Sequence, residues 1–270
     1  MSQPERGDLT FLQHLEELRW HLVRSVLAIL VGMVAAFLNK SFIFDTLIFG
    51  PKRTDFLTYR AFCKLGTYIH AEDSLCLTSI PFQVVNLDMA GQFMNHLKVS
   101  AILGFVAAFP YIFWEAWRFI KPALHAKERK YTRGVVFFTS ILFGIGCLFG
   151  YYIMVPFSIN FLGSYQVAEE VVNTINLESY VGMISMLVLS SGIIFELPMV
   201  VYFLSKIGLL TPEFMRNYRR HAVIIILVVA AVITPPDVTS QILISIPLWL
   251  LYEASIFVSA RVQRSRESDI

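Results

Sequence analysis

Charged residues are scarce in this sequence. Only 16% of the 270 residues are charged and 56% are hydrophobic, with a mean hydropathy of +0.62. A soluble domain has about 25% charged residues, so this composition excludes a soluble globular protein and predicts one that folds in a lipid bilayer. The net charge of +2 gives no indication of a nucleic-acid partner.

The signatures of nucleotide, metal and nucleophile chemistry are also missing from the sequence. It contains no Walker loop and no Gly-x-Ser-x-Gly elbow, and its six histidines are scattered without a metal-binding spacing. The glycines of "FGIGCLFG" lie inside an apolar run, where Gly146 and Gly150 have the spacing at which two membrane helices approach closely. We therefore expect no enzyme, no catalytic residue, no metal site and no cofactor.

Six apolar runs predict membrane-spanning helices. They are Leu18–Leu38, Val99–Trp117, Val135–Phe157, Tyr180–Leu204, Ala222–Ile233 and Ile242–Ser259. A span needs about 20 residues, so the fifth run is short, and either the bilayer thins there or the fifth and sixth helices form a shallow hairpin. The turn "ITPPDVTSQ" favours a hairpin, because prolines end the first helix and Asp237 can help to cap the next. The predicted fold class is an all-α polytopic membrane protein with six transmembrane helices, forming a single integral membrane domain over residues 1–270.

The basic residues predict the orientation of these helices. With six spans, 16 of the 22 Lys and Arg residues lie on the side that holds both termini. The positive-inside rule then places both termini in the cytoplasm. The cytoplasmic segments would be the loops at about 118–134 and 205–221 and the tail at 260–270.

A long loop at about 39–92 falls on the outer side. It mixes apolar, aromatic and charged residues, which is too apolar for a flexible linker, so we expect a structured periplasmic cap. The sequence has three cysteines, and Cys63 and Cys76 both lie in this loop. In an oxidising compartment they could form a disulfide that contributes about 3 kcal/mol. Their spacing fixes no geometry, so the pairing stays open, whereas Cys147 lies in the third apolar run and is expected to be a buried apolar residue.

Two acidic clusters lie at the predicted cytoplasmic surface. The first is "HLEELRWHL", which contains Glu17 and Arg19, and the second is "WRFIKPALHAKERKYTRG", where Glu128 is surrounded by basic residues. Each has a purely structural interpretation as well. The first could be an interfacial helix with acids near its amino end, and the second a solvated positive-inside loop.

The ordered set of motifs resembles the TatC subunit of the twin-arginine protein translocase. The set comprises "HLEELR", "FIKPALHAKERK", "FELP", "GLLTP" and "PPDVTSQILISIP", and it extends over nearly the whole chain. The resemblance implies six helices in a concave, glove-like arrangement with both termini cytoplasmic. It also implies a multi-pass protein of the bacterial cytoplasmic (inner) membrane, in agreement with a chain that starts without a transit peptide or a cleavable signal peptide.

The resemblance implies a binding site for twin-arginine signal peptides. Its glutamates match Glu17 and Glu128, with supporting positions that match Arg19, Phe119 and Leu124. A pair of guanidinium groups suits carboxylates in a fork geometry that lysine cannot reproduce.

Glu196 is an ionisable residue inside the fourth apolar run, next to Pro198. Pro198 cannot donate a hydrogen bond to the carbonyl of Ile194, so we expect a kink beside a protonated acid. The family places this glutamate where partner helices and the inserted peptide act, and Gln241 matches another polar position there. The alternative is a structural acid with a local hydrogen bond. We also single out the loop and kink positions Pro110, Pro122, Pro198 and Asp237.

The resemblance implies a receptor that assembles with the single-span partners TatA and TatB, associates with itself in the bilayer, and exports folded cargo using the proton-motive force. Two alternatives remain open at this point. One is a proton-coupled secondary transporter that uses Glu196, although no internal repeat with a second broken helix is present. The other is a structural scaffold.

Overall fold

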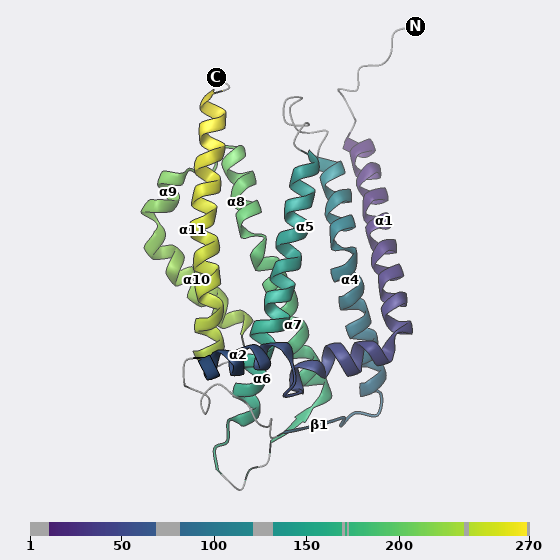
Figure 1. The fold of residues 1–270 in the computed structure, drawn as a ribbon. Coiled ribbons are helices and arrows are strands. Elements are labelled where there is room, and N and C mark those ends of the chain that lie inside the picture. The colour runs from purple at the N-terminus through teal and green to yellow at the C-terminus, as the bar shows by residue number, and fades with distance from the viewer. Residues whose placement is uncertain are drawn as a thin grey trace. The chain divides into compact units, whose positions relative to one another are not determined.

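The computed structural model describes residues 11–68, 82–120, 132–168, 171, 173–234 and 238–268. Helices dominate them, as the sequence predicts (Figure 1). The chain divides into two compact units, Met1–Asn39 with His96–Ile141 and Lys40–Asn95 with Leu142–Ile270.

The first unit is built on a close pair of helices. It contains α1 (Phe11–Leu38), most of α4 (Gly91–Ile120) and the first part of α5 (Thr132–Phe149). A Cβ atom on Gly104 of α4 would lie 2.5 Å from the backbone nitrogen of Met33 and 2.7 Å from the carbonyl oxygen of Ile29, both on α1. The two backbones are therefore in direct contact at this crossing, which only a glycine permits.

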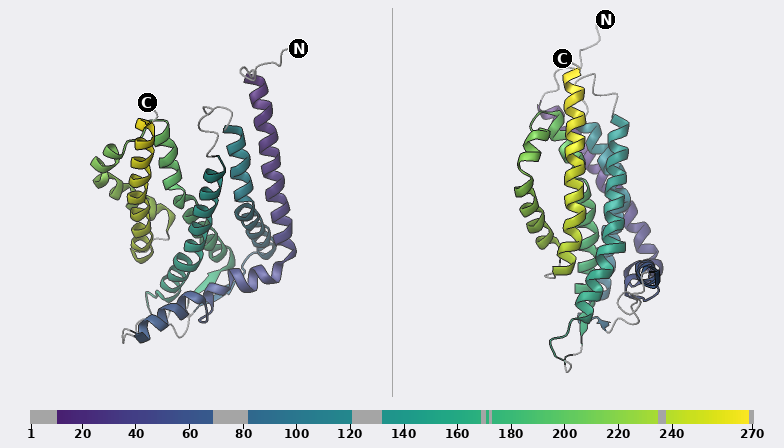
Figure 2. Two further views of the ribbon diagram at one scale, coloured as in Figure 1. Left: turned by 45° about the horizontal axis from the view of Figure 1, so that its top comes forward. Right: turned by 60° about the vertical axis from the view of Figure 1, so that its left-hand side comes forward.

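The second unit holds the remaining elements. They are η1 (Phe42–Ile48), η2 (Gly50–Lys52), α2 (Leu57–Tyr68), β1 (Gln83–Val85), η5 (Gly150–Met154), α6 (Val155–Ser164), β2 (Thr174–Asn176), α7 (Leu177–Phe195), α8 (Leu197–Lys206), α9 (Pro212–Asn217), α10 (Arg219–Ile233) and α11 (Val238–Ser268). Two views show α8, α10 and α11 side by side (Figures 1 and 2). Val201, Met215 and Ile256, from α8, α9 and α11, form a buried cluster between them.

Five helical segments in the described part of the chain are long and apolar enough to cross a membrane. They are Leu15–Leu38, Gly91–Ile120, Gly134–Ser164, Leu177–Lys206 and Gln241–Arg264, and they coincide with five of the six predicted spans. The predicted fifth span lies in α10, which has 15 residues. At 1.5 Å per residue this helix is about 22 Å long, shorter than a hydrocarbon core of about 30 Å. This length agrees with the short fifth run in the sequence.

The second span is a longer helix than its apolar run predicts. It begins at Gly91 instead of Val99, and the added residues include the buried polar residues Asn95 and His96. Pro110 lies inside α4 and does not end it.

Short secondary structure in the loop at 39–92 packs within the second unit. Strand β1 pairs in parallel with β2, with Val84 opposite Ile175. The buried Tyr59 of α2 has its hydroxyl 3.0 Å from the carbonyl oxygens of Pro51 and Pro156, and burial raises the pKa of this phenol. These contacts connect the loop to α6, the last part of the third span.

The cysteines of the described residues differ in state. Cys63 is disulfide-bonded, and Cys147 is free and buried. Cys76 lies outside the described residues, so the pairing of Cys63 with Cys76 stays a prediction.

Small residues set the distance between α5 and α7. A Cβ on Gly146 would lie 2.6 Å from the carbonyl oxygen of Ser191 and 2.8 Å from the Cα of Gly192. One turn further, a Cβ on Gly150 would lie 2.8 Å from the carbonyl oxygen of Leu187. The close approach predicted from the glycine spacing is therefore present along two turns of the crossing.

We expect Gly146→Ala to lower the free energy of unfolding by about 1 to 3 kcal/mol, because the added methyl group meets backbone atoms that cannot rotate away. Gly144 lies on the same helix, and a Cβ atom added there would have no atom within 4 Å. Gly144→Ala is therefore the matched control, and it gains helix propensity. Thermal unfolding of both purified variants in detergent measures the difference. Equal stability of the two variants would contradict the close crossing.

Candidate functional site

The amino-terminal turns of α1 expose two carboxylates that differ in their partners. Arg19 lies 3.8 Å from Glu16, and its guanidinium lies over the ring of Trp20, 5.6 Å from the centroid. Both partners of this ion pair are largely exposed, so it contributes little to stability. Glu17 is exposed and forms no ion pair within the described residues. Within the described part of the chain, no other side chain therefore occupies this carboxylate.

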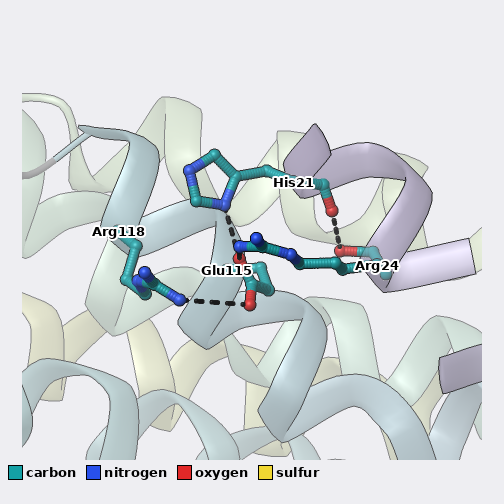
Figure 3. A network of polar contacts seen from close by, with 5 residues as sticks. His21, Arg24, Glu115 and Arg118 are labelled. Atoms are coloured by element: carbon teal, nitrogen blue, oxygen red, sulfur yellow. Dashed lines mark hydrogen bonds and ion pairs between the residues drawn. The ribbon is translucent and has the colours of Figure 1, made fainter. Parts of the chain in front are cut away.

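A buried carboxylate on α4 lies among three basic side chains (Figure 3). Glu115 is 1% exposed. Its Oε2 forms a hydrogen bond with Nδ1 of His21 and lies 3.9 Å from Arg24. Its Oε1 lies 3.5 Å from Arg118. A buried charge is tolerated only when it is paired and hydrogen-bonded, and both oxygens of Glu115 meet this condition. We call these four residues the Glu115 network.

Helix geometry relates the Glu115 network to the exposed Glu17. Glu17, His21 and Arg24 follow one another at spacings of four and three residues, so they share one face of α1. His21 and Arg24 contact Glu115, so this is the face that α1 turns toward α4. Glu17 lies one turn before His21 on that face.

Phe119 joins the same region from α4. It lies one turn after Glu115, is half-buried, and contacts the ring of His21 edge to face, with centroids 6.1 Å apart. The structure therefore brings Phe119 to the histidine that follows Glu17. Arg19 points from a different face of α1 and contacts Glu16 instead.

A groove between α1 and α4 adjoins the Glu115 network. Its volume is about 490 Å³, and it is lined by Arg24, Leu27, Ala28, Val31, Gly32, Ala107, Ala108 and Tyr111. Small side chains hollow it out, and the basic Arg24 marks the end that meets the network.

The intramembrane candidates lie in the second unit. Glu196 separates α7 from α8, since α7 ends at Phe195 and α8 begins at Leu197. The backbone break is therefore where Pro198 predicts it, and Pro198 itself is buried. Glu196 is half-buried, and its Oε1 is buried without a hydrogen-bond partner among the described residues. Gln241 is half-buried on α11 and donates through Nε2 to the carbonyl oxygen of Leu227 on α10, at 3.3 Å.

Some of the predicted positions fall outside the described residues. These are Leu124 and Glu128 of the peptide site, the loop positions Pro122 and Asp237, and Cys76. Their roles stay predictions.

The Glu115 network does not emerge from the sequence patterns. In the sequence, His21 is one of six scattered histidines, and Glu115 is not part of a recognised motif. Arg24 and Arg118 contribute only to the predicted membrane orientation. One signal is present, because Glu115 is an acid close to the end of a predicted span with a basic residue three positions later. The pairing with His21 joins residues 94 positions apart, which no local pattern indicates.

The fold and this site define a class of protein, a helical protein that crosses the membrane several times and holds a buried charge network on one helix pair. The model of the family described as Sec-independent protein translocase protein (TatC) matches residues 13–247. A protein of that name from Blattabacterium sp. subsp. Periplaneta americana is 42% identical over 263 residues, which cover 97% of this chain and 99% of the relative. Another from Aquifex aeolicus is 30% identical over 256 residues, covering 94% and 96%.

Two solved structures of the same family are also similar to this chain. A crystal structure described as the twin arginine translocase receptor TatC has a TM-score of 0.68 and 31% identity, and covers 93% of this chain and 99% of that one. A second such structure, in DDM, has a TM-score of 0.71 and 31% identity, covering 91% and 99%.

The chain belongs to the TatC family. This confirms the predicted family and the helical, multi-span membrane fold. The protein is a translocase subunit of the TatC type, a transport protein and not an enzyme. The family thus favours protein translocation over the solute transporter and the scaffold that the sequence left open.

Proposed function

We propose that this chain is the receptor that binds the twin-arginine signal peptides of folded cargo proteins, and that it exports them together with TatA and TatB type partners. The observation that carries the proposal is Glu17, an exposed carboxylate without an ion pair in the described part of the chain, one turn before the Glu115 network. The solved relatives described as twin-arginine translocase receptors support it.

Recognition would rest on charge and geometry. A guanidinium group donates two parallel hydrogen bonds to one carboxylate, which an ammonium group cannot do. Glu17 would accept one arginine of the pair and Glu128 the other. Phe119, Arg19 and Leu124 would support the bound peptide, and the ring of Phe119 is already fixed against His21.

After the arginines have bound, Glu196 and Gln241 would contact the partner helices and the inserted part of the signal peptide. A carboxyl oxygen that is buried without a partner favours any polar group that a neighbouring helix brings to it. We assign this role to TatA and TatB type helices and to the inserted peptide. The short α10 would thin the bilayer near these partners.

The proposal includes the membrane in which the protein lies and the side on which its termini are found. The protein would lie in the bacterial cytoplasmic membrane with both termini in the cytoplasm, as the distribution of basic residues favours. Copies of the chain would associate within a receptor complex, and the proton-motive force would drive transport.

Export of a folded reporter tests this function. The chain is produced with the TatA and TatB type partners of its own organism in a bacterium that lacks a twin-arginine system, and the reporter carries either a twin-arginine or a twin-lysine signal peptide. We expect export of the arginine reporter only, and its loss when a protonophore collapses the proton-motive force. Equal export of both reporters would refute the proposed specificity.

A further inference from the structure

We infer that Glu115 is a positioning residue that keeps Arg24 away from Glu17, so that Glu17 stays free for the guanidinium group of a signal peptide. This inference rests on the proposed function, because it concerns how the recognition carboxylate is kept unoccupied.

Arg24 is a competitor for Glu17 within the chain. The two residues lie two turns apart on the same face of α1, about 10 Å along the helix axis. Side chains on a helix lean toward its amino terminus, so the long side chain of Arg24 leans toward Glu17. An intramolecular guanidinium has a high effective concentration, and it would occupy the carboxylate ahead of a peptide.

The structure shows what holds Arg24 elsewhere. Its guanidinium lies 3.9 Å from Oε2 of Glu115, and Arg118 lies 3.5 Å from Oε1. Arg24 and Arg118 are 47% and 45% exposed, whereas Glu115 is 1% exposed. The anchoring carboxylate is therefore fixed, and the two arginines are exposed enough to turn to another acid if it is removed.

The charge balance leads to the same conclusion. One carboxylate faces two permanent positive charges and one histidine in the Glu115 network. Without Glu115 both arginines would lose the negative charge that now lies beside them, and each would favour another carboxylate within reach. Arg24 would then pair with Glu17, the acid on its own helix face.

A merely structural role makes a different prediction. If Glu115 only ties α1 to α4, its replacement lowers stability and weakens every peptide alike, and removal of Arg24 as well brings no recovery. If Glu115 holds Arg24 away from Glu17, its replacement weakens the binding of the arginine peptide selectively, and removal of Arg24 restores that binding.

The test compares Glu115→Gln with the double variant Glu115→Gln/Arg24→Gln in the purified full chain. Glutamine keeps the size of Glu115 and removes its charge. The ratio of the Kd values for twin-lysine and twin-arginine peptides is measured by titration of fluorescently labelled peptide, with thermal unfolding of each variant in parallel. We expect Glu115→Gln to lower the ratio about tenfold, and the double variant to return it to within about threefold of the wild-type ratio.

The matched control is Glu253→Gln. Glu253 lies 2.6 Å from Arg219 in the second unit, so the same chemical change breaks another Glu–Arg pair, and we expect an unchanged ratio. An unchanged ratio in Glu115→Gln, or a lowered ratio that the double variant does not restore, would overturn the inference. A wild-type protein without any arginine preference would instead refute the proposed function.

Discussion

Replacing Glu17 by Gln is expected to weaken the binding of a twin-arginine peptide about 10- to 100-fold, because a charge-assisted hydrogen bond contributes about 1.5 to 3 kcal/mol. The loss would arise at the carboxylate to which we assign recognition, since Glu17 is exposed and pairs with no side chain in the described residues. Its removal leaves no buried partner unsatisfied, so we expect stability to change by less than about 0.5 kcal/mol. Peptide titration and thermal unfolding of the same preparation give both values.

Glu16→Gln is the matched control for this variant. Glu16 is the neighbouring acid on α1, and it is paired with Arg19 at 3.8 Å. Because Glu16 lies about 100° around α1 from Glu17 and off the face that carries His21 and Arg24, we expect Glu16→Gln to weaken peptide binding much less than Glu17→Gln does. A larger effect from Glu16→Gln would move the recognition carboxylate by one residue and contradict this assignment.

Glu196→Leu is expected to abolish export while leaving peptide binding intact and making the isolated protein more stable. One carboxyl oxygen of Glu196 is buried without a hydrogen-bond partner in the described part of the chain, and such a group costs about 1 to 3 kcal/mol. Leucine removes this cost at the break between α7 and α8. It also removes the polar group that we assign to partner helices.

The opposite signs of the two effects make this prediction specific. Export of a folded reporter in cells measures the loss of function, and thermal unfolding in detergent measures the gain in stability. Glu196→Gln keeps a hydrogen-bonding group of similar size, so it should retain more export than Glu196→Leu. Normal export by Glu196→Leu would show that this acid is a structural residue, as the alternative interpretation of the sequence has it.

The sequence predicted the features that depend on local chemistry. Hydrophobic length located the long spans, and the short fifth run appears as the 15-residue α10. Pro198 lacks the N–H that helix continuation requires, so a kink near Glu196 was predicted, and α7 and α8 meet at that residue. The glycine spacing in the third span likewise predicted a close helix crossing, which Gly146 makes with α7.

Features that depend on contacts distant in the chain could not be predicted in this way. The parallel pairing of β1 with β2 joins two three-residue strands about 90 positions apart, too short for an alternating pattern to be recognised. The bond from His21 to Glu115 likewise requires the crossing of α1 and α4 to be known first. Glu17 was identified from a motif, whereas the network that surrounds its helix face required the fold.

Binding of a twin-arginine peptide and a twin-lysine peptide to the purified wild-type protein in detergent tests the central claim most directly. We expect at least a tenfold preference for the arginine peptide, since only a guanidinium matches a carboxylate in two parallel hydrogen bonds. Equal affinities would contradict it, because the carboxylates on this surface would then act only as charges and would not recognise arginine.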